Sequence, residues 1–197
     1  MEIALEHVSK AYGGQSVLRD FSHVFPEGRV ACVVGSSGCG KTTLLRLIAG
    51  LEAPDSGRIT PAPEGIAMVF QEDRLPPQLT AAGCLRSVLP RTPERDESIA
   101  GALRALGLWE DRDKPVREYS GGMRRRVALA RALLFPSPWL LMDEPFKGLD
   151  EQTRAQAVAF ALPRMRGRTT VMVTHDLREA ELLGGEVLRL GALQGSL

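Results

Sequence analysis

The chain has 197 residues; 44% are hydrophobic, 25% are charged, and 25 Lys and Arg residues are balanced by 24 Asp and Glu residues. These values are typical of one soluble globular domain with a substantial core. The near balance of charge argues against a protein that binds nucleic acid through bulk positive charge.

The cysteines and the apolar runs narrow the class further. Cys32, Cys39 and Cys84 form no CxxC pair and no ligand spacing with the histidines, so we expect a reduced, cytosolic protein without a structural zinc. No apolar run approaches the roughly 18 residues that span a bilayer. The start of the chain, MEIALEHVSK, lacks the basic residues and apolar stretch of a signal peptide. Any work at a membrane is therefore expected to use a partner chain.

The first informative element is a phosphate loop. The apolar run from Val30 to Val34 predicts a buried parallel strand. The residues from Lys41 to Ala49 have helical character, and Gly50 is a suitable stop. Between them, GSSGCGKT at 35–42 matches the GxxxxGK[ST] pattern in full. Glycines let the backbone point successive N–H groups at phosphate oxygens, and the helix start adds partial positive charge.

Two side chains of this loop are expected to complete a nucleotide site. Lys41 supplies a full charge for the β- and γ-phosphates, and the Thr42 hydroxyl is a ligand for Mg²⁺. The alternative is a glycine-rich turn with a chance lysine, which the flanking strand and helix disfavour. Cys39 stands at a helix start, where a thiol can be reactive, but we interpret it as a small side chain whose backbone N–H matters.

A proline-containing stretch at about 72–118 follows, with helix-like runs such as DESIAGALRALGLWE. Its boundaries predict a small helical subdomain inserted into the sheet domain. Leu106, Leu108 and Trp109 are its expected core, because apolar residues are usually buried. The alternative for Trp109 is a place in a docking groove.

The run YSGGM at 119–123 opens a second helix start of the anion-binding kind. Ser120 is a good N-cap, and Gly121 and Gly122 allow an anion to approach closely. Because the phosphate loop is already complete, the simplest interpretation is that this second start caps a nucleotide held by another copy of the protein. The arginines that follow, at 124–126, are interpreted as a solvated helix face, or else as ligands of phosphate or of a partner's carboxylates.

Two further strands end in side chains with chemistry to offer. The apolar run Trp139 to Met142 ends in Asp143 and Glu144; ligands gather at the carboxyl ends of parallel strands, so these carboxylates are expected to hold Mg²⁺ and to polarise the attacking water. The β-branched run at 169–173 is followed by His175, which could steady charge on the γ-phosphate. Asp176 is expected to cap the next helix. The alternatives are ordinary acidic turn residues and a surface histidine.

Taken together, these segments resemble the ATPase subunits of the ATP-binding cassette (ABC) family, in the right order over nearly the whole chain. The resemblance implies that Tyr12 lies on the adenine, that Gln71 in VFQED contacts Mg²⁺ and senses the partner, and that Asp150 ends the D-loop FKGLD. It makes Glu144, His175 and Gln71 the catalytic set and Thr42, Gln71 and Asp143 the metal ligands. The implied nucleotide-binding residues are Tyr12, Gly35, Ser36, Ser37, Gly38, Cys39, Gly40, Lys41, Thr42, Thr43, Ser120, Gly121, Gly122 and Asp150.

The resemblance also implies the fold and its division. We expect an α/β phosphate-loop NTPase fold with a RecA-like mixed sheet, an N-terminal antiparallel β region and the inserted helical subdomain. One domain over 1–197 would have its core at 1–71 and about 119–197. The run YSGGM at 119–123 corresponds to the family's signature motif, and Tyr119 and Met123 depart from its usual residues. Lys147 departs from the usual residue in the D-loop. The Ser-Gly-Gly core of the signature is intact.

The expected function is ATP hydrolysis that drives a membrane transporter, as a bacterial importer of a small solute similar to nitrate, sulfonate and taurine systems. The expected assembly is a homodimer, or else a dimer with a homologue, on permease subunits at the cytoplasmic face of the plasma membrane. It would use a solute-binding protein, ATP and Mg²⁺, and no nucleic acid. The alternatives are a soluble ABC ATPase acting as a switch or assembly factor, and a subunit of an exporter. A phosphate-loop kinase would leave the Ser-Gly-Gly element and the Gln71 segment unexplained.

Overall fold

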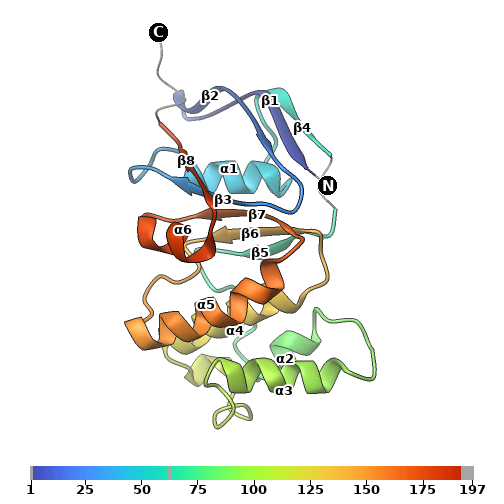
Figure 1. Cartoon of the computed structure of the whole chain (residues 1–197). Helices are drawn as coiled ribbons and strands as arrows, with labels where there is room; N and C mark the ends of the chain where they lie inside the picture. The colour runs from blue at the N-terminus through green and yellow to red at the C-terminus, as the bar shows by residue number, and fades with distance from the viewer. Residues whose placement is uncertain (1, 62–63, 192–197) are drawn as a thin grey trace. The chain divides into compact units, whose positions relative to one another are not determined.

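A computed structural model describes residues 2–61 and 64–191. The helices and strands appear in Figure 1 in chain order. They are β1 (Ile3–Tyr12), β2 (Gln15–Phe25), β3 (Val30–Val34), α1 (Lys41–Ile48), β4 (Ser56–Thr60), β5 (Ala67–Val69), α2 (Ala81–Arg86), α3 (Arg95–Ala105), the 3₁₀ helix η1 (Val116–Glu118), α4 (Gly121–Leu134), β6 (Trp139–Asp143), α5 (Glu151–Met165), β7 (Thr169–Val173), α6 (Leu177–Leu183) and β8 (Glu186–Arg189).

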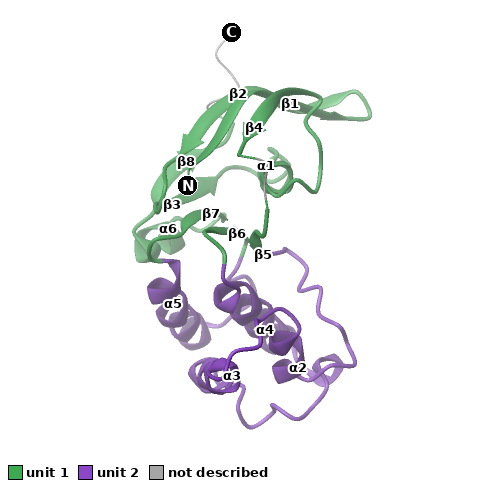
Figure 2. Cartoon of the chain, turned by 90° about the vertical axis from the view of Figure 1, so that its right-hand side faces the viewer, with its two compact units in different colours: residues 1–68, 137–144, 166–197 green, residues 69–136, 145–165 purple. Residues whose placement is uncertain are grey.

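The chain divides into two compact units, coloured separately in Figure 2. Unit 1 comprises residues 1–68, 137–144 and 166–197, and unit 2 comprises 69–136 and 145–165. The segment 72–118, expected as an inserted subdomain, lies inside unit 2, which also takes in α4 and α5.

Unit 1 contains two sheets. The antiparallel sheet has the order β2-β1-β4, and the register of β1 on β2 shifts between Leu5 and Val8 and again toward Ala11. The other sheet has the order β5-β6-β7-β3-β8, and β3 pairs in parallel with β7 and β8 while β6 pairs in parallel with β7. Every residue of β6 and β7 is buried, as the continuous apolar runs predicted.

The core of unit 1 joins these elements. It combines inward-facing residues of β1 and β2, the apolar side of α1, and residues of β3, β6 and β7. Phe21 and Phe25 on β2 are 2% and 1% exposed, and Leu44 and Leu45 on α1 are fully buried. Since α1 packs on β6 and β7, the helix that follows the phosphate loop is held rigidly against the strands that carry the other candidate site residues.

Unit 2 is helical. Its helices pack as α2 on α3 and α4, and α3 and α4 on α5. Leu106 and Leu108 are fully buried, which confirms them as core residues. Trp109 is only partly buried, and the guanidinium carbons of Arg104 and Arg112 lie 4.0 Å and 4.3 Å from the centre of its ring. Cation–π contacts of this kind stabilise an aromatic ring that the core does not enclose.

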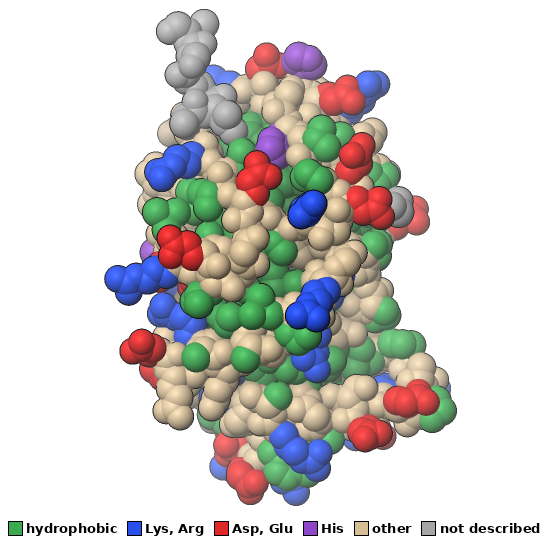
Figure 3. Space-filling view, viewed as in Figure 1, with side chains coloured by type: hydrophobic (Ala, Val, Ile, Leu, Met, Phe, Trp, Pro, Cys, Tyr) green, Lys and Arg blue, Asp and Glu red, His purple; other side chains and the backbone are tan. Residues whose placement is uncertain are grey.

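The fold expected from the sequence is confirmed: an α/β chain with a parallel-stranded sheet, an antiparallel N-terminal sheet and a helical segment inserted in the sequence between β5 and β6. Strands β3 and β7 have the predicted bounds, and α1 begins at Lys41 as predicted. No helix in the described part of the chain is both long enough and apolar enough to span a bilayer. On the face drawn in Figure 3, acidic and basic side chains are interspersed, which agrees with the near-neutral composition.

Candidate functional site

The register of three strands brings the candidate residues of unit 1 to one edge of the sheet. Val173 at the end of β7 pairs with Val33 of β3 on one side and with Asp143 of β6 on the other. The phosphate loop begins two residues after Val33, and His175 lies two residues after Val173. Parallel pairing therefore places the phosphate loop, the carboxylate pair and the histidine beside one another, as the sequence predicted.

The phosphate loop has the backbone of an anion cradle. Gly38 and Gly40 adopt φ values of 80° and 101°, which side chains rarely allow. At Gly40 a Cβ atom would also lie 2.8 Å from Val17 Cγ1 and 3.0 Å from the Val17 carbonyl oxygen. A glycine is therefore required at this position for the loop to lie against β2.

The start of α1 suits a phosphate group. Gly40 is the N-cap, it provides no side-chain cap, and the first turn of α1 holds no acidic residue. The first N–H groups and the positive end of the helix dipole are therefore directed at whatever lies in the loop. The Lys41 ammonium donates to the carbonyl oxygens of Gly35 and Ser36 at 2.8 Å and 2.7 Å, which holds its charge over the same loop.

The carboxylate pair occupies two different environments at the end of β6. Asp143 is 2% exposed and belongs to the strand. Glu144 leaves the strand with φ at 47°, and its N–H donates to the Val173 carbonyl at 2.9 Å. A left-handed conformation at a residue other than glycine costs about 1–3 kcal/mol, and such strain gathers at functional sites.

Glu144 and His175 meet directly. Glu144 Oε1 lies 3.3 Å from His175 Nδ1, the Glu144 side chain is 16% exposed and the His175 side chain is 66% exposed. A partly buried carboxylate beside an exposed imidazole can together orient a water and stabilise charge on a phosphate.

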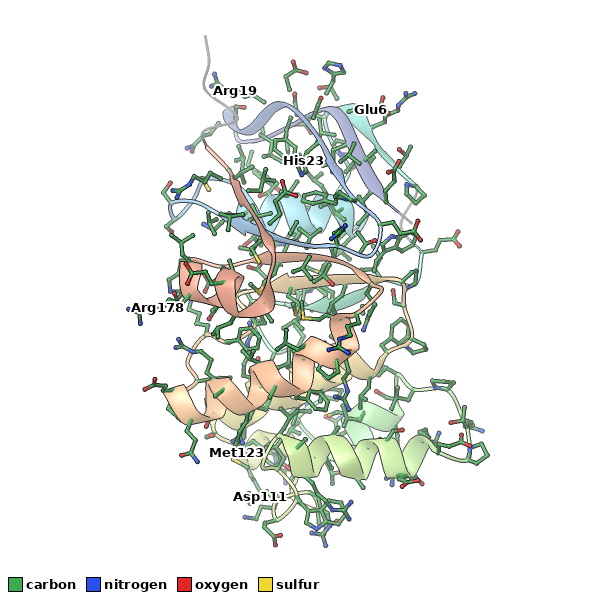
Figure 4. All side chains as sticks on the ribbon, viewed as in Figure 1. Glu6, Arg19, His23, Asp111, Met123 and Arg178 are labelled. Atoms are coloured by element: carbon green, nitrogen blue, oxygen red, sulfur yellow. The ribbon has the colours of Figure 1, made fainter. Side chains whose placement is uncertain are left out.

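A small network fixes the backbone around His175. The buried Thr174 hydroxyl donates to Glu179 Oε2 at 2.6 Å, and the Asp176 N–H donates to Thr174 Oγ1 at 3.0 Å. Asp176 caps α6 by accepting the Arg178 N–H, which confirms the predicted cap. Arg178, labelled in Figure 4, is exposed. Sequence reasoning missed Glu179, because nothing in the sequence showed that this acidic residue of α6 is buried.

Tyr12 lies in a polar cluster that the sequence did not reveal. Its hydroxyl donates to Glu52, and Lys10 Nζ lies 5.6 Å from the centre of its ring. Burial and the bond to Glu52 raise the pKa of Tyr12. Glu52 also pairs with Arg46 of α1 at 3.2 Å. Tyr12 stays 44% exposed, and its stacking on a base remains a prediction.

Unit 2 carries the signature residues. Ser120 is the N-cap of α4, and its Oγ accepts the Met123 N–H at 3.2 Å, which confirms the predicted cap; Met123 is labelled in Figure 4. A Cβ on Gly121 would meet nothing within 4 Å, and the first turn of α4 holds no acidic residue. This helix start is therefore open to an anion.

The departure at Tyr119 has a structural explanation. Tyr119 is 3% exposed, and its hydroxyl donates to the Asp111 carbonyl at 2.7 Å. Burial raises the pKa of Tyr119 to about 12, so the side chain stays neutral and serves as an anchor. It fills an apolar position while its hydroxyl ties the loop at Asp111, labelled in Figure 4, to the start of α4.

The other two predicted residues of unit 2 are on its loops. Gln71 is exposed. The Asp150 carboxylate accepts the N–H and the hydroxyl of Thr153 at 2.9 Å and 2.7 Å, and these bonds lower the pKa of Asp150. Asp150 thus caps α5, a role that sequence reasoning did not predict for it.

The interpretation of the arginine run as a solvated face is wrong for Arg125. Arg125 is 4% exposed and bonds to groups of unit 2, whereas Arg124 and Arg126 are partly buried. Arg124 donates to the Tyr119 carbonyl, and Arg126 donates to the Leu106 carbonyl. A guanidinium can be buried where carbonyls and a carboxylate satisfy its donors, which the sequence alone does not show.

The described residues hold no group of three or more His, Cys, Asp and Glu side chains that could bind a metal. The oxygens of Asp143 and Thr42 suit Mg²⁺ nonetheless, because that ion binds to one or two protein oxygens together with phosphate oxygens and water.

The fold and the site define an α/β phosphate-loop nucleotide-binding cassette. A second helix N-terminus suited to an anion lies at the start of α4. The ABC transporter family profile matches residues 18–147. The chain therefore belongs to the ABC transporter family.

Curated relatives support the same family. The chain is 40% identical to the aliphatic sulfonates import ATP-binding protein SsuB of Cupriavidus pinatubonensis, over 93% of this chain and 64% of that protein. It is 39% identical to the sn-glycerol-3-phosphate import ATP-binding protein UgpC of Brucella abortus, over 97% of this chain and 59% of that protein. The chain thus spans about three fifths of the length of these two relatives.

Solved structures agree with the fold. The dimeric structure of a bacterial ABC transporter cassette superposes with a TM-score of 0.84 at 28% identity, over 95% of this chain and 94% of that one. A post-hydrolysis dimer of the same cassette, bound to ADP and Pi, superposes with a TM-score of 0.83 at 28% identity.

The cysteines offer a test of the phosphate loop. Burial raises the pKa of Cys32 to about 12 and also raises the pKa of Cys84. Because the thiolate is the reactive form, both should resist iodoacetamide at pH 8 in the folded chain. The more accessible Cys39 of the loop should be alkylated, and ATP should slow its alkylation at least about fivefold, since bound phosphates cover the loop. Peptide mass spectrometry measures all three, and alkylation of Cys39 at the same rate with and without ATP would contradict the site.

Proposed function

We propose that the chain is the ATP-hydrolysing, energy-coupling subunit of a membrane ABC transporter, a bacterial importer of a small solute, and that it works as a head-to-tail nucleotide-sandwich dimer. One observation carries this proposal. The chain has a complete phosphate loop in unit 1 and a second open helix start, Ser120-Gly121-Gly122, in unit 2. A second copy gives that start a phosphate to bind. The importer names of the relatives and the dimeric solved cassette support the proposal.

The nucleotide contacts follow from the site. The N–H groups of the loop from Gly35 to Thr43 bind the phosphates, Lys41 neutralises the β- and γ-phosphates, and the exposed ring of Tyr12 stacks on the adenine. Thr42, Asp143 and Gln71 would hold Mg²⁺. When bound, this ion neutralises the charge that develops on the transferred phosphoryl group.

Ser120 can donate a hydrogen bond to the partner's nucleotide and still cap α4. Its Oγ uses a lone pair to accept the Met123 N–H, and the hydroxyl proton remains available to a phosphate oxygen. Gly121 and Gly122 let that phosphate approach the start of α4, and Asp150 completes the D-loop beside it.

Hydrolysis then depends on the pair at the end of β6 and β7. Glu144 orients and polarises the water that attacks the γ-phosphorus in line, ADP leaves, and His175 stabilises the charge that develops on the γ-phosphoryl group. The products are ADP and inorganic phosphate. Hydrolysis requires the signature residues of the partner at the γ-phosphate, so it occurs only after the dimer closes. Gln71 senses the partner, and together with the helical subdomain it passes the motion of the dimer to the permease.

The proposed partners are a second copy of the chain, integral membrane permease subunits and a solute-binding protein, with no nucleic acid. The proposed place is the cytoplasmic face of the plasma membrane, reached through the permease. In this proposal residues 1–197 act as one ABC ATPase domain, with the helical subdomain at about 72–118 meeting the permease.

Glu144→Gln tests the catalytic carboxylate. An amide keeps the size but cannot polarise water as a carboxylate does, so ATP hydrolysis should fall about a hundredfold or more. ATP binding should persist, and the ATP-bound dimer should accumulate in size-exclusion chromatography. The exposed Glu181→Gln on α6 is the control and should behave as wild type. The same dimer population for Glu144→Gln and wild type with ATP would count against the sandwich.

Ser120→Arg tests the contact in trans. A bulky cation at the start of α4 should block the partner's nucleotide and lower turnover at least about tenfold. ATP binding to the monomer, measured with a fluorescent ATP analogue, should change less than about twofold, since the phosphate loop is intact. Ala105→Arg, exposed on α3, adds the same charge to unit 2 as a control. Full turnover of Ser120→Arg would show that the signature is not used in trans.

Membrane co-purification tests the transporter. Affinity-tagged chain expressed from its native context should bring down an integral membrane permease, whose solute then becomes open to direct assay. Recovery of soluble partners alone would instead favour a soluble ABC ATPase that acts as a switch. A permease that moves solute outward would replace the importer with an exporter.

A further inference from the structure

Arg125 of α4, in the helical unit coloured purple in Figure 2, makes contacts that a surface arginine would not make. Its side chain is 5% exposed. Nε donates to the Pro145 carbonyl at 3.0 Å, while Nη1 donates to the Phe70 carbonyl at 2.6 Å and to Asp73 Oδ1 at 3.2 Å. The Gln71 carbonyl is 3.4 Å from the same nitrogen. One guanidinium thus joins two segments that are far apart in the sequence.

The first segment carries Gln71. The carbonyls of Phe70 and Gln71 both face Arg125, and a second arginine of α4 bonds to the residues that follow. Arg131 donates to the Arg74 carbonyl at 2.9 Å and to the Asp73 carbonyl at 3.2 Å. The backbone that presents Gln71 is therefore attached to α4, the helix that begins with the signature glycines.

The second segment begins directly after Glu144. Glu144 has φ at 47°, and a residue other than glycine keeps such a conformation only where its surroundings over-determine it. On the N-terminal side, the Glu144 N–H donates to the Val173 carbonyl. On the C-terminal side, the Pro145 carbonyl accepts from Arg125 Nε. Proline has no backbone N–H with which to form a second hydrogen bond. The bond from Arg125 to the Pro145 carbonyl is therefore the backbone hydrogen bond that can hold this residue.

We propose that Arg125 is a positioning residue for ATP hydrolysis, which holds the backbone beside Gln71 and the backbone beside Glu144 through one guanidinium. The inference rests on the proposed function of those two residues. Only arginine has donors at several angles in one rigid plane, so a lysine or glutamine at 125 can keep at most part of the arrangement. Asp73 balances the buried charge and needs no contact with nucleotide.

The chain offers a matched control for the buried pair of Arg125 and Asp73. Arg86 and Asp96 form a second Arg–Asp pair in unit 2, with Nε to Oδ1 at 2.9 Å and side chains that are 48% and 61% exposed. Arg86→Gln removes the same charge and the same kind of ion pair as Arg125→Gln, but from the surface. The two variants of the full chain are compared with wild type in steady-state hydrolysis of Mg-ATP and in hydrogen exchange by mass spectrometry.

We expect Arg125→Gln to lower kcat about tenfold to a hundredfold, because small displacements of positioned groups cost factors of this order. KM for ATP should change less than about threefold, since the phosphate loop and Tyr12 are untouched. Peptides over 68–74 and 141–149 should exchange faster, while peptides over α3 should not. Arg125→Lys should restore part of kcat. Arg86→Gln should match wild type in every readout.

Two outcomes overturn the proposal. One is a kcat for Arg125→Gln equal to that of Arg86→Gln. The other is faster exchange over all of unit 2 with parallel loss of kcat and melting temperature, which marks a purely structural residue. If Arg125→Gln fails to fold, Arg125→Lys keeps the buried charge but lacks the several donors of the guanidinium. Its kcat, KM and hydrogen exchange then test the proposal in the same way. A wild-type chain without ATPase activity would refute the proposed function, whereas the exchange data would still test whether Arg125 holds both segments.

Discussion

Parallel pairing of β6 with β7 and of β7 with β3 is the constraint on which the candidate site depends. It aligns Val33, Val173 and Asp143 in one row, so the residues that follow each strand must emerge at the same edge. A shift of one residue in any of these pairings would turn the strand's side chains to the opposite face. Because every residue of β6 and β7 is buried, such a shift would also mismatch the side chains that pack closely on both faces.

The same edge also combines rigid and strained elements. Helix α1 packs on β6 and β7 and holds the phosphate loop in place, whereas Glu144 leaves β6 in a left-handed conformation. The conformation at Glu144 has anchors on both sides, the Val173 carbonyl and the contact of Pro145 with Arg125. Buried hydrogen-bond networks of this kind are worth more than their separate bonds, because a low local dielectric strengthens each of them.

Family membership and physical reasoning carry different parts of the conclusion. The match to the ABC transporter family and to a dimeric cassette supports the fold and the nucleotide chemistry. The curated relatives are longer than this chain, and their solutes differ from one another, so similarity alone selects no solute. Selectivity resides in the surfaces that meet the solute, and in the proposed assembly those surfaces belong to other chains.

The sequence by itself determined the local elements: the strand before the phosphate loop, the glycines of that loop, the caps at Ser120 and Asp176, and the buried runs of β6 and β7. These are set by neighbouring residues, through periodicity, capping and the conformational freedom of glycine. Only the tertiary structure decided that Arg125 is buried, that Glu179 supports Thr174, that Tyr12 binds Glu52 and that Tyr119 anchors the loop at Asp111. A polar side chain becomes buried when segments distant in sequence bring it partners, and no local pattern records those partners.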